Sequence, residues 1–291
     1  MSGTIRLGTA GWVYEPWRGS FYPEGLPQKQ ELGFASKALG AIEINATFYS
    51  HQKAASFASW ASQTPEGFVF SVKGHQLVTH LKKLKDVEVP LANFFASGVL
   101  ALGGKLGPFC WQLPGNLTYA PDRIEAFLQL LPKTPEALLA LARRSDERLK
   151  QPPFLELGAI SRVRHAIEVR HASFARPEFV AQLRAHDVAL VTADTAEWPF
   201  ADQTAEFSYA RLQGAPGKEC YQAAELDARA AWLRAWADGR PVADAPCLTA
   251  PQSEPPPRDV FAFFVSTDKE NAPGNARRVM ARLGLRGPGE A

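Results

Sequence analysis

The sequence predicts an α/β protein built as a single (β/α)₈ barrel, with a long loop after its first strand. Eight short β-rich segments recur along the chain, and most are followed by a segment with helical periodicity. The length of 291 residues is typical of one such barrel, so we expect one domain over residues 1–291 with its core at about 5–284. An open doubly wound sheet is the alternative, but no Gly-rich phosphate turn follows the first strand.

Each β-rich segment is short, apolar on one face and bounded by turn residues. The predicted strands are Ile5–Ala10, Ala41–Asn45, Phe68–Lys73, Gly107–Leu113, His165–Arg170, Ala189–Asp194, Phe207–Leu212 and Val260–Ser266. The predicted helices are Lys29–Leu39, Ala54–Ser62, Leu91–Leu102, helical segments from Pro121 to about Lys150, Pro177–His186, Asp227–Asp238 and Asn271–Leu283. Only a short irregular link is expected after the sixth strand. This alternation predicts parallel strands with crossover helices, as in barrels of the TIM type.

Composition narrows the class of protein. The net charge of +2, from 32 basic and 30 acidic residues, lacks the basic excess typical of dedicated nucleic-acid binders. Three widely spaced cysteines, Cys110, Cys220 and Cys247, indicate neither a disulfide framework nor a structural zinc site. The sequence shows no signal peptide and no apolar segment long enough to span a membrane, so we expect a cytoplasmic protein.

Polar side chains gather at the C-terminal ends of the predicted strands, where barrel enzymes place their active sites. Because successive strand side chains point to opposite faces, alternate residues share a face. The polar residues on the shared faces are Glu43, Asn45, Ser71, Lys73, Gln112, Glu168, Arg170, Thr192, Asp194, Tyr209 and Arg211. Buried charges are costly unless they are paired, so this placement requires either an internal salt-bridge network or a ligand.

Histidines, possible metal ligands and cysteines also help to decide between a salt-bridge network and a ligand site. His51, His75, His80 and His171 follow strands, and any of them has a pKa suited to carrying a proton. The chain has no HxH or HExxH spacing, and the nearby cations oppose a divalent ion, so a catalytic metal is disfavoured. Without a GxSxG motif, Cys110 is interpreted as a small buried apolar residue.

Aromatic residues are concentrated in the loops that follow the strands. They are Trp12, Tyr14, Trp17, Phe21 and Tyr22 in the first loop, then Phe48, Tyr49, Phe174, Trp198 and Phe200. Such residues can stack on a sugar or a base. The alternative, which we expect for at least half of them, is that they pack the long first loop onto the barrel.

These motifs resemble those of the YecE-like family, also called domain of unknown function 72. The resemblance covers Ile5 to about Leu283. It is carried by Gly8-Thr9-Ala10-Gly11-Trp12, Glu43-Ile44-Asn45-Ala46-Thr47-Phe48-Tyr49, Phe70-Ser71-Val72-Lys73 with Thr79-His80, Gln112-Leu113-Pro114, Glu168-Val169-Arg170-His171-Ala172-Ser173-Phe174, Ala193-Asp194-Thr195 and Tyr209-Ala210-Arg211-Leu212-Gln213-Gly214. The chain departs from the family's usual pattern at Gln213, where His is frequent, and at Thr267-Asp268, where Asn-Asp is frequent. The resemblance implies a barrel but no settled activity.

The leading functional hypothesis is an enzyme of hydrolase or lyase type that acts on an anionic, phosphate- or sugar-bearing small molecule. Glu168 is the expected general acid or base, with Glu43 or Asp194 as its partner and His171 as a further proton carrier. The residues expected to bind substrate are Lys73, Arg170, Arg211, Asn45, Gln112, Tyr209, Trp12, Tyr49 and His80. The alternatives are a nucleic-acid-binding protein that uses loop aromatics and cations, and a noncatalytic binder of a small ligand.

Overall fold

The structure is a computed structural model that describes residues 2–214, 221–242, 245–250, 253–265 and 269–289. Within them, eight strands follow one another in the order β1 to β8 and form a closed barrel, with neighbouring strands parallel. The strands are β1 Ile5–Ala10, β2 Ala41–Ile44, β3 Val69–Lys73, β4 Leu106–Gln112, β5 His165–Glu168, β6 Ala189–Ala193, β7 Phe207–Leu212 and β8 Asp259–Phe264. The predicted (β/α)₈ fold class is confirmed.

Helices separate most of the strands in the chain. They are α1 Gln28–Ala38, α2 Ala46–Tyr49, α3 Ala54–Ser62, α4 Glu88–Ala96, α5 Pro121–Leu130, α6 Pro135–Ala142, α7 Pro177–Ala185, α8 Ala223–Asp238 and α9 Ala272–Arg282. Residues 194–206, all of which are described, contain no helix, so the link after β6 is irregular as predicted. Pro121, Pro135 and Pro177 each open a helix at its first turn, where the missing amide hydrogen costs nothing.

The helix predicted over Leu91–Leu102 is wrong in its extent. The α-helix α4 ends at Ala96, and a 3₁₀ segment over Val99–Lys105 leads into β4. Gly98 separates the two with φ 132°, a conformation that L side chains rarely adopt. A glycine of this kind ends a helix even where the apolar periodicity continues across it.

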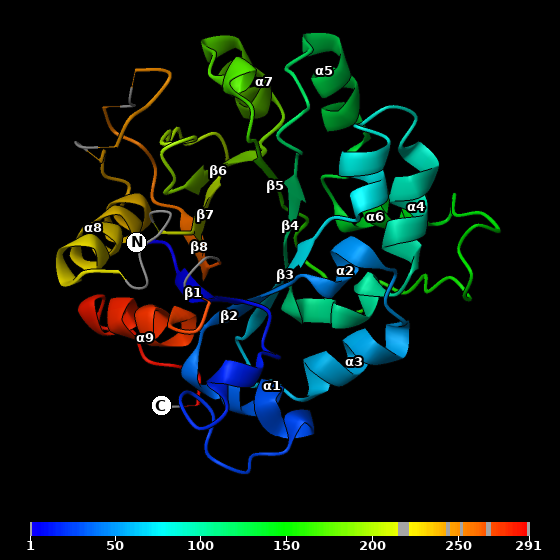
Figure 1. Cartoon of the computed structure of the whole chain (residues 1–291). Coiled ribbons are helices and arrows are strands. Elements are labelled where there is room, and N and C mark those ends of the chain that lie inside the picture. The colour runs from blue at the N-terminus through cyan, green and yellow to red at the C-terminus, as the bar shows by residue number, and fades with distance from the viewer. Residues whose placement is uncertain (1, 215–220, 243–244, 251–252, 266–268, 290–291) are drawn as a thin grey trace. The chain divides into compact units, whose positions relative to one another are not determined.

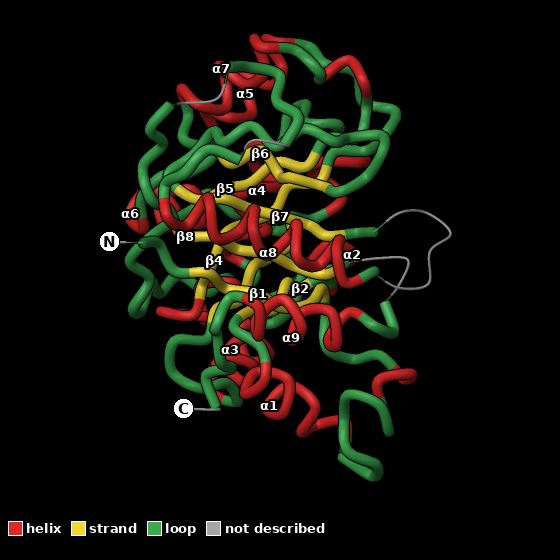
Figure 2. Tube along the Cα trace, turned by 90° about the vertical axis from the view of Figure 1, so that its left-hand side faces the viewer, coloured by secondary structure: helices red, strands yellow, loops and turns green. Residues whose placement is uncertain are grey.

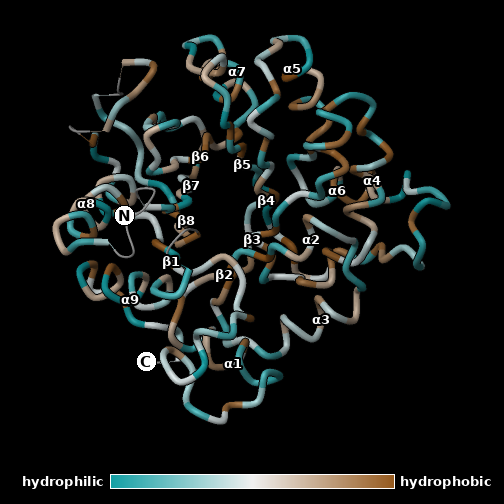
Figure 3. Tube along the Cα trace, in the orientation of Figure 1, coloured by the Kyte–Doolittle hydropathy of each residue, from teal (hydrophilic) through white to brown (hydrophobic). Residues whose placement is uncertain are grey.

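The chain divides into two compact units. The terminal unit comprises Met1–Glu43, Thr64–Phe68 and Ala175–Ala291, and the central unit comprises Ile44–Gln63 and Val69–Phe174. In the terminal unit, α8 and α9 lie side by side and pack against β1 and β8 (Figures 1 and 2). Hydrophobic and hydrophilic residues alternate along α9 because only one of its faces is buried (Figure 3). That residues 1–291 form one domain stays a prediction.

The central unit has an aromatic core between β4 and its helices. Trp111 and Phe109 of β4 pack against Phe94 and Phe95 of α4 with ring centroids 5.1–6.2 Å apart. His165 of β5 joins this cluster, fully buried, and stacks on Phe109 at 5.4 Å. Trp111 and Phe109 occupy the face of β4 opposite Gln112, so the alternation of the strand separates the core from a polar face.

We expect Gly8→Ala to destabilise the protein by about 3 kcal/mol or more. Gly8 pairs with Ala41 across β1 and β2, and a Cβ added at Gly8 would lie 1.7 Å from the carbonyl oxygen of Ala41. That oxygen belongs to the backbone, so the two strands would have to separate. Denaturant unfolding measures the effect, with Gly274→Ala in α9 as control because nothing lies within 4 Å of its added Cβ. A Gly8 variant as stable as the control would contradict the prediction.

Candidate functional site

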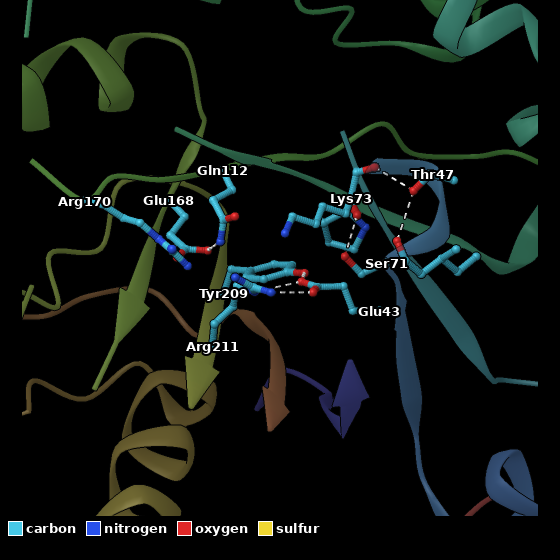
Figure 4. A network of polar contacts seen from close by, with 11 residues as sticks. Glu43, Thr47, Ser71, Lys73, Gln112, Glu168, Arg170, Tyr209 and Arg211 are labelled. Carbon is cyan, nitrogen blue, oxygen red and sulfur yellow. Dashed lines mark hydrogen bonds and ion pairs between the residues drawn. The ribbon is translucent and has the colours of Figure 1, made fainter. Parts of the chain in front are cut away.

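Glu43 at the end of β2 is the centre of a buried ion pair in the terminal unit. Its carboxylate accepts hydrogen bonds from Arg211 at both oxygens, Nη2 to Oε1 at 2.9 Å and Nε to Oε2 at 3.1 Å (Figure 4). The Tyr209 hydroxyl donates to Oε2 at 2.7 Å. Tyr209 and Arg211 alternate on β7, which explains why both side chains face the same carboxylate. With Glu43 fully buried and Arg211 only 4% exposed, the pair is shielded from water.

Asp194, just after β6, lies in a second polar cluster of the terminal unit. Its Oδ1 accepts the backbone amides of Gln213 and Gly214, while its Oδ2 accepts the Tyr221 hydroxyl at 2.7 Å and Arg229 Nε at 3.2 Å. Burial, and then the charge of Asp194, raise the pKa of Tyr221. Four donors therefore surround Asp194, and they tie the loop after β7 to α8.

Tyr221 and Arg229 are members of this cluster that the sequence analysis missed. Arg229 lies three residues after Leu226 and four before Leu233, which are both buried residues of α8. A charged residue on the apolar stripe of a helix needs a partner, and this spacing is the signal that indicates one.

Glu168 ends β5 and is the buried carboxylate of the central unit. The register of β4 and β5 places Gln112 beside it, and Gln112 Nε2 donates to Glu168 Oε2 at 2.8 Å. Arg170 Nε donates to Glu168 Oε1 at 3.0 Å, and Arg170 Nη2 forms an ion pair with the same oxygen at 3.0 Å (Figure 4). The Glu168 side chain is 1% exposed, whereas that of Arg170 is 46% exposed. The pair thus connects a buried carboxylate to a guanidinium that solvent and ligands can reach.

Lys73 and His80 lie on the same side of the central unit. The Lys73 side chain extends toward Gln112 (Figure 4), and its Nζ lies 4.3 Å from the centroid of the Phe48 ring. The His80 ring contacts Phe48 edge-on at 4.9 Å, and its Nδ1 shares a 2.9 Å hydrogen bond with the Thr79 hydroxyl. Burial lowers the pKa of His80, and the positive charges of Lys73 and Arg170 lower it further, while Glu168 opposes them. His80 is therefore neutral near pH 7.

The backbone that carries His80 is irregular. Leu77–Leu81 form a single π-helical turn, a feature that is frequent at functional sites. Lys83, Leu84 and Asp86, shortly after it, have φ between 48° and 67°, which is unusual for residues other than glycine. The segment holds this strained conformation while Val78 and Leu84 are buried.

The remaining predicted residues differ in their surroundings. Asn45 begins α2, and its buried Oδ1 has no hydrogen-bond partner within the described residues. Tyr49 is 70% exposed, and Trp12 is half-buried with its carbonyl oxygen accepting the Tyr22 hydroxyl. His171 Nδ1 accepts the backbone amide of Ser173 and lies 2.8 Å from its hydroxyl oxygen. The Oδ1 atom of Asn45 could therefore accept a hydrogen bond from a ligand, and the exposed ring of Tyr49 could contact one.

Three aromatic residues of the first loop, Trp17, Phe21 and Tyr22, pack against one another. Trp17 and Tyr22 are buried, and Phe21 contacts both of them as well as Phe34 of α1. The indole nitrogen of Trp17 donates to the backbone oxygen of Lys269 at 2.8 Å. These rings stabilise the loop and offer little surface to a ligand.

Two histidines near α2 form a close pair. The rings of His51 and His75 lie 4.7 Å apart, and the backbone amide of Leu77 donates to His75 Nδ1. Burial and the neighbouring His51 lower the pKa of His75 to about 4, and burial lowers that of His51. Across the described ranges, no three His, Cys, Asp or Glu side chains form a group that could hold a metal ion.

Cys110 is buried as expected, and Cys247 is half-buried. Cys220 and Thr267-Asp268 lie outside the described residues. No helix in the described part of the chain is both long and apolar enough to cross a membrane.

Comparison with known proteins assigns the family. The family model described as "Protein of unknown function DUF72" matches residues 6–290. The chain belongs to the DUF72 family. The resemblance seen in the strand-end motifs is thereby confirmed, since the match includes every one of them.

Solved structures of the DUF72 family share the fold. A DUF72 family protein of Thermotoga maritima aligns with a TM-score of 0.70 and 22% identity, covering 97% of this chain and 99% of that one. One from Enterococcus faecalis V583 aligns with a TM-score of 0.65 and 18% identity, covering 97% and 98%. UPF0759 protein YunF of Bacillus subtilis is 33% identical over 75 residues, a match that spans 26% of each chain.

Proposed function

We propose that this DUF72 protein is an enzyme of hydrolase or lyase type that acts on a small anionic molecule bearing a phosphate or a sugar. The observation that supports it best is Glu168, a carboxylate with 1% exposure that is held between Gln112 and the half-exposed Arg170. Ionisable groups in such surroundings are frequent in active sites. A carboxylate fixed at both oxygens is oriented for proton transfer with a bound substrate.

Arg170 and Lys73 supply the positive charge that an anionic substrate needs. Arg170 uses Nε and Nη2 on Glu168, and its Nη1 makes no hydrogen bond within the described residues. Guanidinium donors suit the oxygens of phosphate or carboxylate, and Lys73 adds a point charge on the same side of the unit. Gln112, Asn45 and Tyr49 would orient the substrate, with the Asn45 Oδ1 as an acceptor.

His80 is proposed as a proton carrier beside Glu168. Its lowered pKa leaves it neutral near pH 7, so its ring can both accept and donate a proton during a reaction cycle. His171, two residues beyond the end of β5 and hydrogen-bonded to Ser173, is the alternative carrier.

Glu43 is proposed as the carboxylate that acts with Glu168 as the second acid or base. Arg211 and Tyr209 are proposed to bind the substrate. Asp194 is the alternative, but its four donors come from loop and helix groups, which favours a structural role. Glu43 accepts instead from Tyr209 and Arg211, whose side chains alternate along one strand. A catalytic metal stays disfavoured because Lys73 and Arg170 would oppose a divalent ion.

We expect Arg170→Ala to weaken binding of the anionic ligand at least tenfold, and Glu168→Gln to lower turnover by a factor of about 10²–10⁴ while binding persists. A thermal-shift screen with phosphate, sugar phosphates, nucleotides, short oligonucleotides and divalent metals first identifies the ligand. A ligand at 100 times its Kd stabilises the fold by about 2.7 kcal/mol. Arg143→Ala at the exposed end of α6 is the matched control.

The outcomes distinguish the proposed enzyme from its alternatives. Binding and turnover that survive both substitutions would show the assignment of Arg170 and Glu168 to be wrong. A shift with oligonucleotides alone that weakens steeply with salt would favour a nucleic-acid-binding protein. Binding without turnover of any ligand would favour a noncatalytic binder.

A further inference from the structure

A cavity lies at the N-terminal ends of β7 and β8, within the terminal unit. Its volume of about 50 Å³ holds about four water molecules at 10–15 Å³ each. Gln203 in its wall precedes β7, Arg258 directly precedes β8, and described residues after α8, among them Val242 and Cys247, line one side. Glu43, Tyr209 and Arg211 lie at the opposite ends of strands in the same unit. The cavity is therefore separate from that cluster.

Arg258 is a buried cation in the wall of this cavity. It is 6% exposed and donates from Nη1 to the carbonyl oxygen of Ala205 at 3.0 Å and from Nε to that of Pro256 at 3.3 Å. Within the described residues it forms no ion pair, so its hydrogen-bond partners are neutral. A buried charge with neutral partners alone is costly, because desolvation is not offset by an opposite charge.

Arg184 of α7 lines the same cavity and adds a second positive charge. It donates from Nη2 to the Thr249 hydroxyl at 2.9 Å and from Nε to the carbonyl oxygen of Gln203 at 3.3 Å. Burial, and then the charge of Arg184, lower the pKa of Arg258, while Asp187 opposes the shift. The two guanidinium groups therefore act on each other as like charges.

The acidic side chain in the cavity wall does not neutralise these arginines. Asp202 is 2% exposed, and its oxygens accept the backbone amides of Leu248 and Thr249 as well as the Thr249 hydroxyl. Asp202 therefore fixes the loop after α8, and no ion pair joins it to Arg184 or Arg258 in the part of the chain described. Three arginines thus line the cavity: Arg240 pairs with Asp238, whereas no ion pair to Arg184 or Arg258 occurs among the described residues.

We infer that this cavity is a binding site for a small carboxylic acid with a short apolar body. A carboxylate matches guanidinium donors in shape and charge, and it would place a negative charge beside Arg184 and Arg258. The rest of the wall is mostly apolar and includes Trp236, Val242 and Pro255, which suits a short alkyl group. Nothing in the proposed chemistry of Glu168 requires this site.

Cys247, in the wall of the cavity, provides a direct readout. Iodoacetamide alkylates a thiolate when its sulfur attacks the methylene carbon and iodide leaves, with the thiol proton taken up by the buffer. Burial raises the pKa of Cys247, so the reaction is run at about pH 8.5 and followed at the Cys247 peptide by mass spectrometry. A ligand in the cavity would block access to the sulfur.

The experiment uses the full chain with propionate, propionamide and phosphate at constant ionic strength. We expect saturating propionate to slow alkylation of Cys247 at least fivefold and propionamide to leave it unchanged. Arg184→Gln should abolish the protection, whereas Arg277→Gln on the exposed face of α9 should keep it. Arg184 is exposed on α7, so its variant avoids the folding risk of changing Arg258.

Three results would overturn the inference: no protection by propionate, protection that survives in Arg184→Gln, or equal protection by phosphate. The last would mean that the site accepts oxyanions in general and that the apolar wall plays no part. Loss of turnover at Glu168 would not affect any of these readings, so the two proposals can fail separately.

Discussion

Replacing Arg211 with methionine is expected to lower the free energy of unfolding by about 3–5 kcal/mol. Glu43 is fully buried, and Arg211 supplies two of the hydrogen bonds that its carboxylate accepts. Methionine fills a similar volume but carries no charge. The buried Glu43 carboxylate then loses its ion pair and keeps the hydrogen bond from the Tyr209 hydroxyl. Chemical denaturation of the purified variant measures the loss.

A double substitution tests the physical reason. If the loss comes from an unpaired buried charge, Glu43→Gln together with Arg211→Met should recover most of the stability that Arg211→Met removes. Arg277→Met on the exposed face of α9 controls for loss of an arginine and should change stability by less than about 0.5 kcal/mol. A loss below 1 kcal/mol in the single variant would mean that water reaches Glu43.

Acid is expected to destabilise the protein through His165. Its Nδ1 accepts the Trp111 indole N–H at 3.1 Å, so its proton is on Nε2, which lies 2.8 Å from the carbonyl oxygen of Pro132. A second proton would break the bond to Trp111, and burial lowers the pKa of His165 to about 3. The unfolded chain binds this proton below about pH 6.5, so stability falls as the pH drops from 6.5 toward 3.

The free energy of unfolding is expected to fall by about 1.4 kcal/mol for each pH unit between pH 6.5 and 3, or by about 2 kcal/mol between pH 6.5 and 5. His165→Asn, which keeps an acceptor for the indole but has no titrating ring, should lack this part of the loss. Unfolding free energies of both proteins at pH 7 and pH 5 give the difference. If the two proteins lose the same stability on acidification, His165 already carries its proton in the fold or another group accounts for the loss.

The barrel could be predicted from the sequence because short parallel strands alternate with helices at regular intervals. Ile5–Ala10 and Phe207–Leu212 were predicted at their observed ends, since turn residues bound both segments. The end of the helix predicted over Leu91–Leu102 was not predicted correctly. It depends on the backbone angle of Gly98, which packs closely against Ala54, and the local sequence does not indicate that contact. Boundaries set by tertiary packing are not predictable from periodicity.

The candidate site, too, could be predicted from the sequence only in part. Strand alternation predicted that Tyr209 and Arg211 share a face, and the structure adds that both donate to Glu43. Alternation does not select partners on helices, so Arg229 was missed although it contacts Asp194. Arg184 and Arg258 each resemble an ordinary surface arginine in the sequence, and only the fold brings them to one cavity.

The π-helical turn at Leu77–Leu81 amounts to one additional residue in what would otherwise be an α-helical turn. One residue corresponds to about 100° of rotation about a helix axis. The extra residue therefore rephases every side chain that follows it, and with this phase the His80 ring meets Phe48. Lys83, Leu84 and Asp86, which have positive φ, follow this turn before α4 begins. In sequence alignments of this family, a one-residue gap at this turn would mark a relative whose histidine points elsewhere.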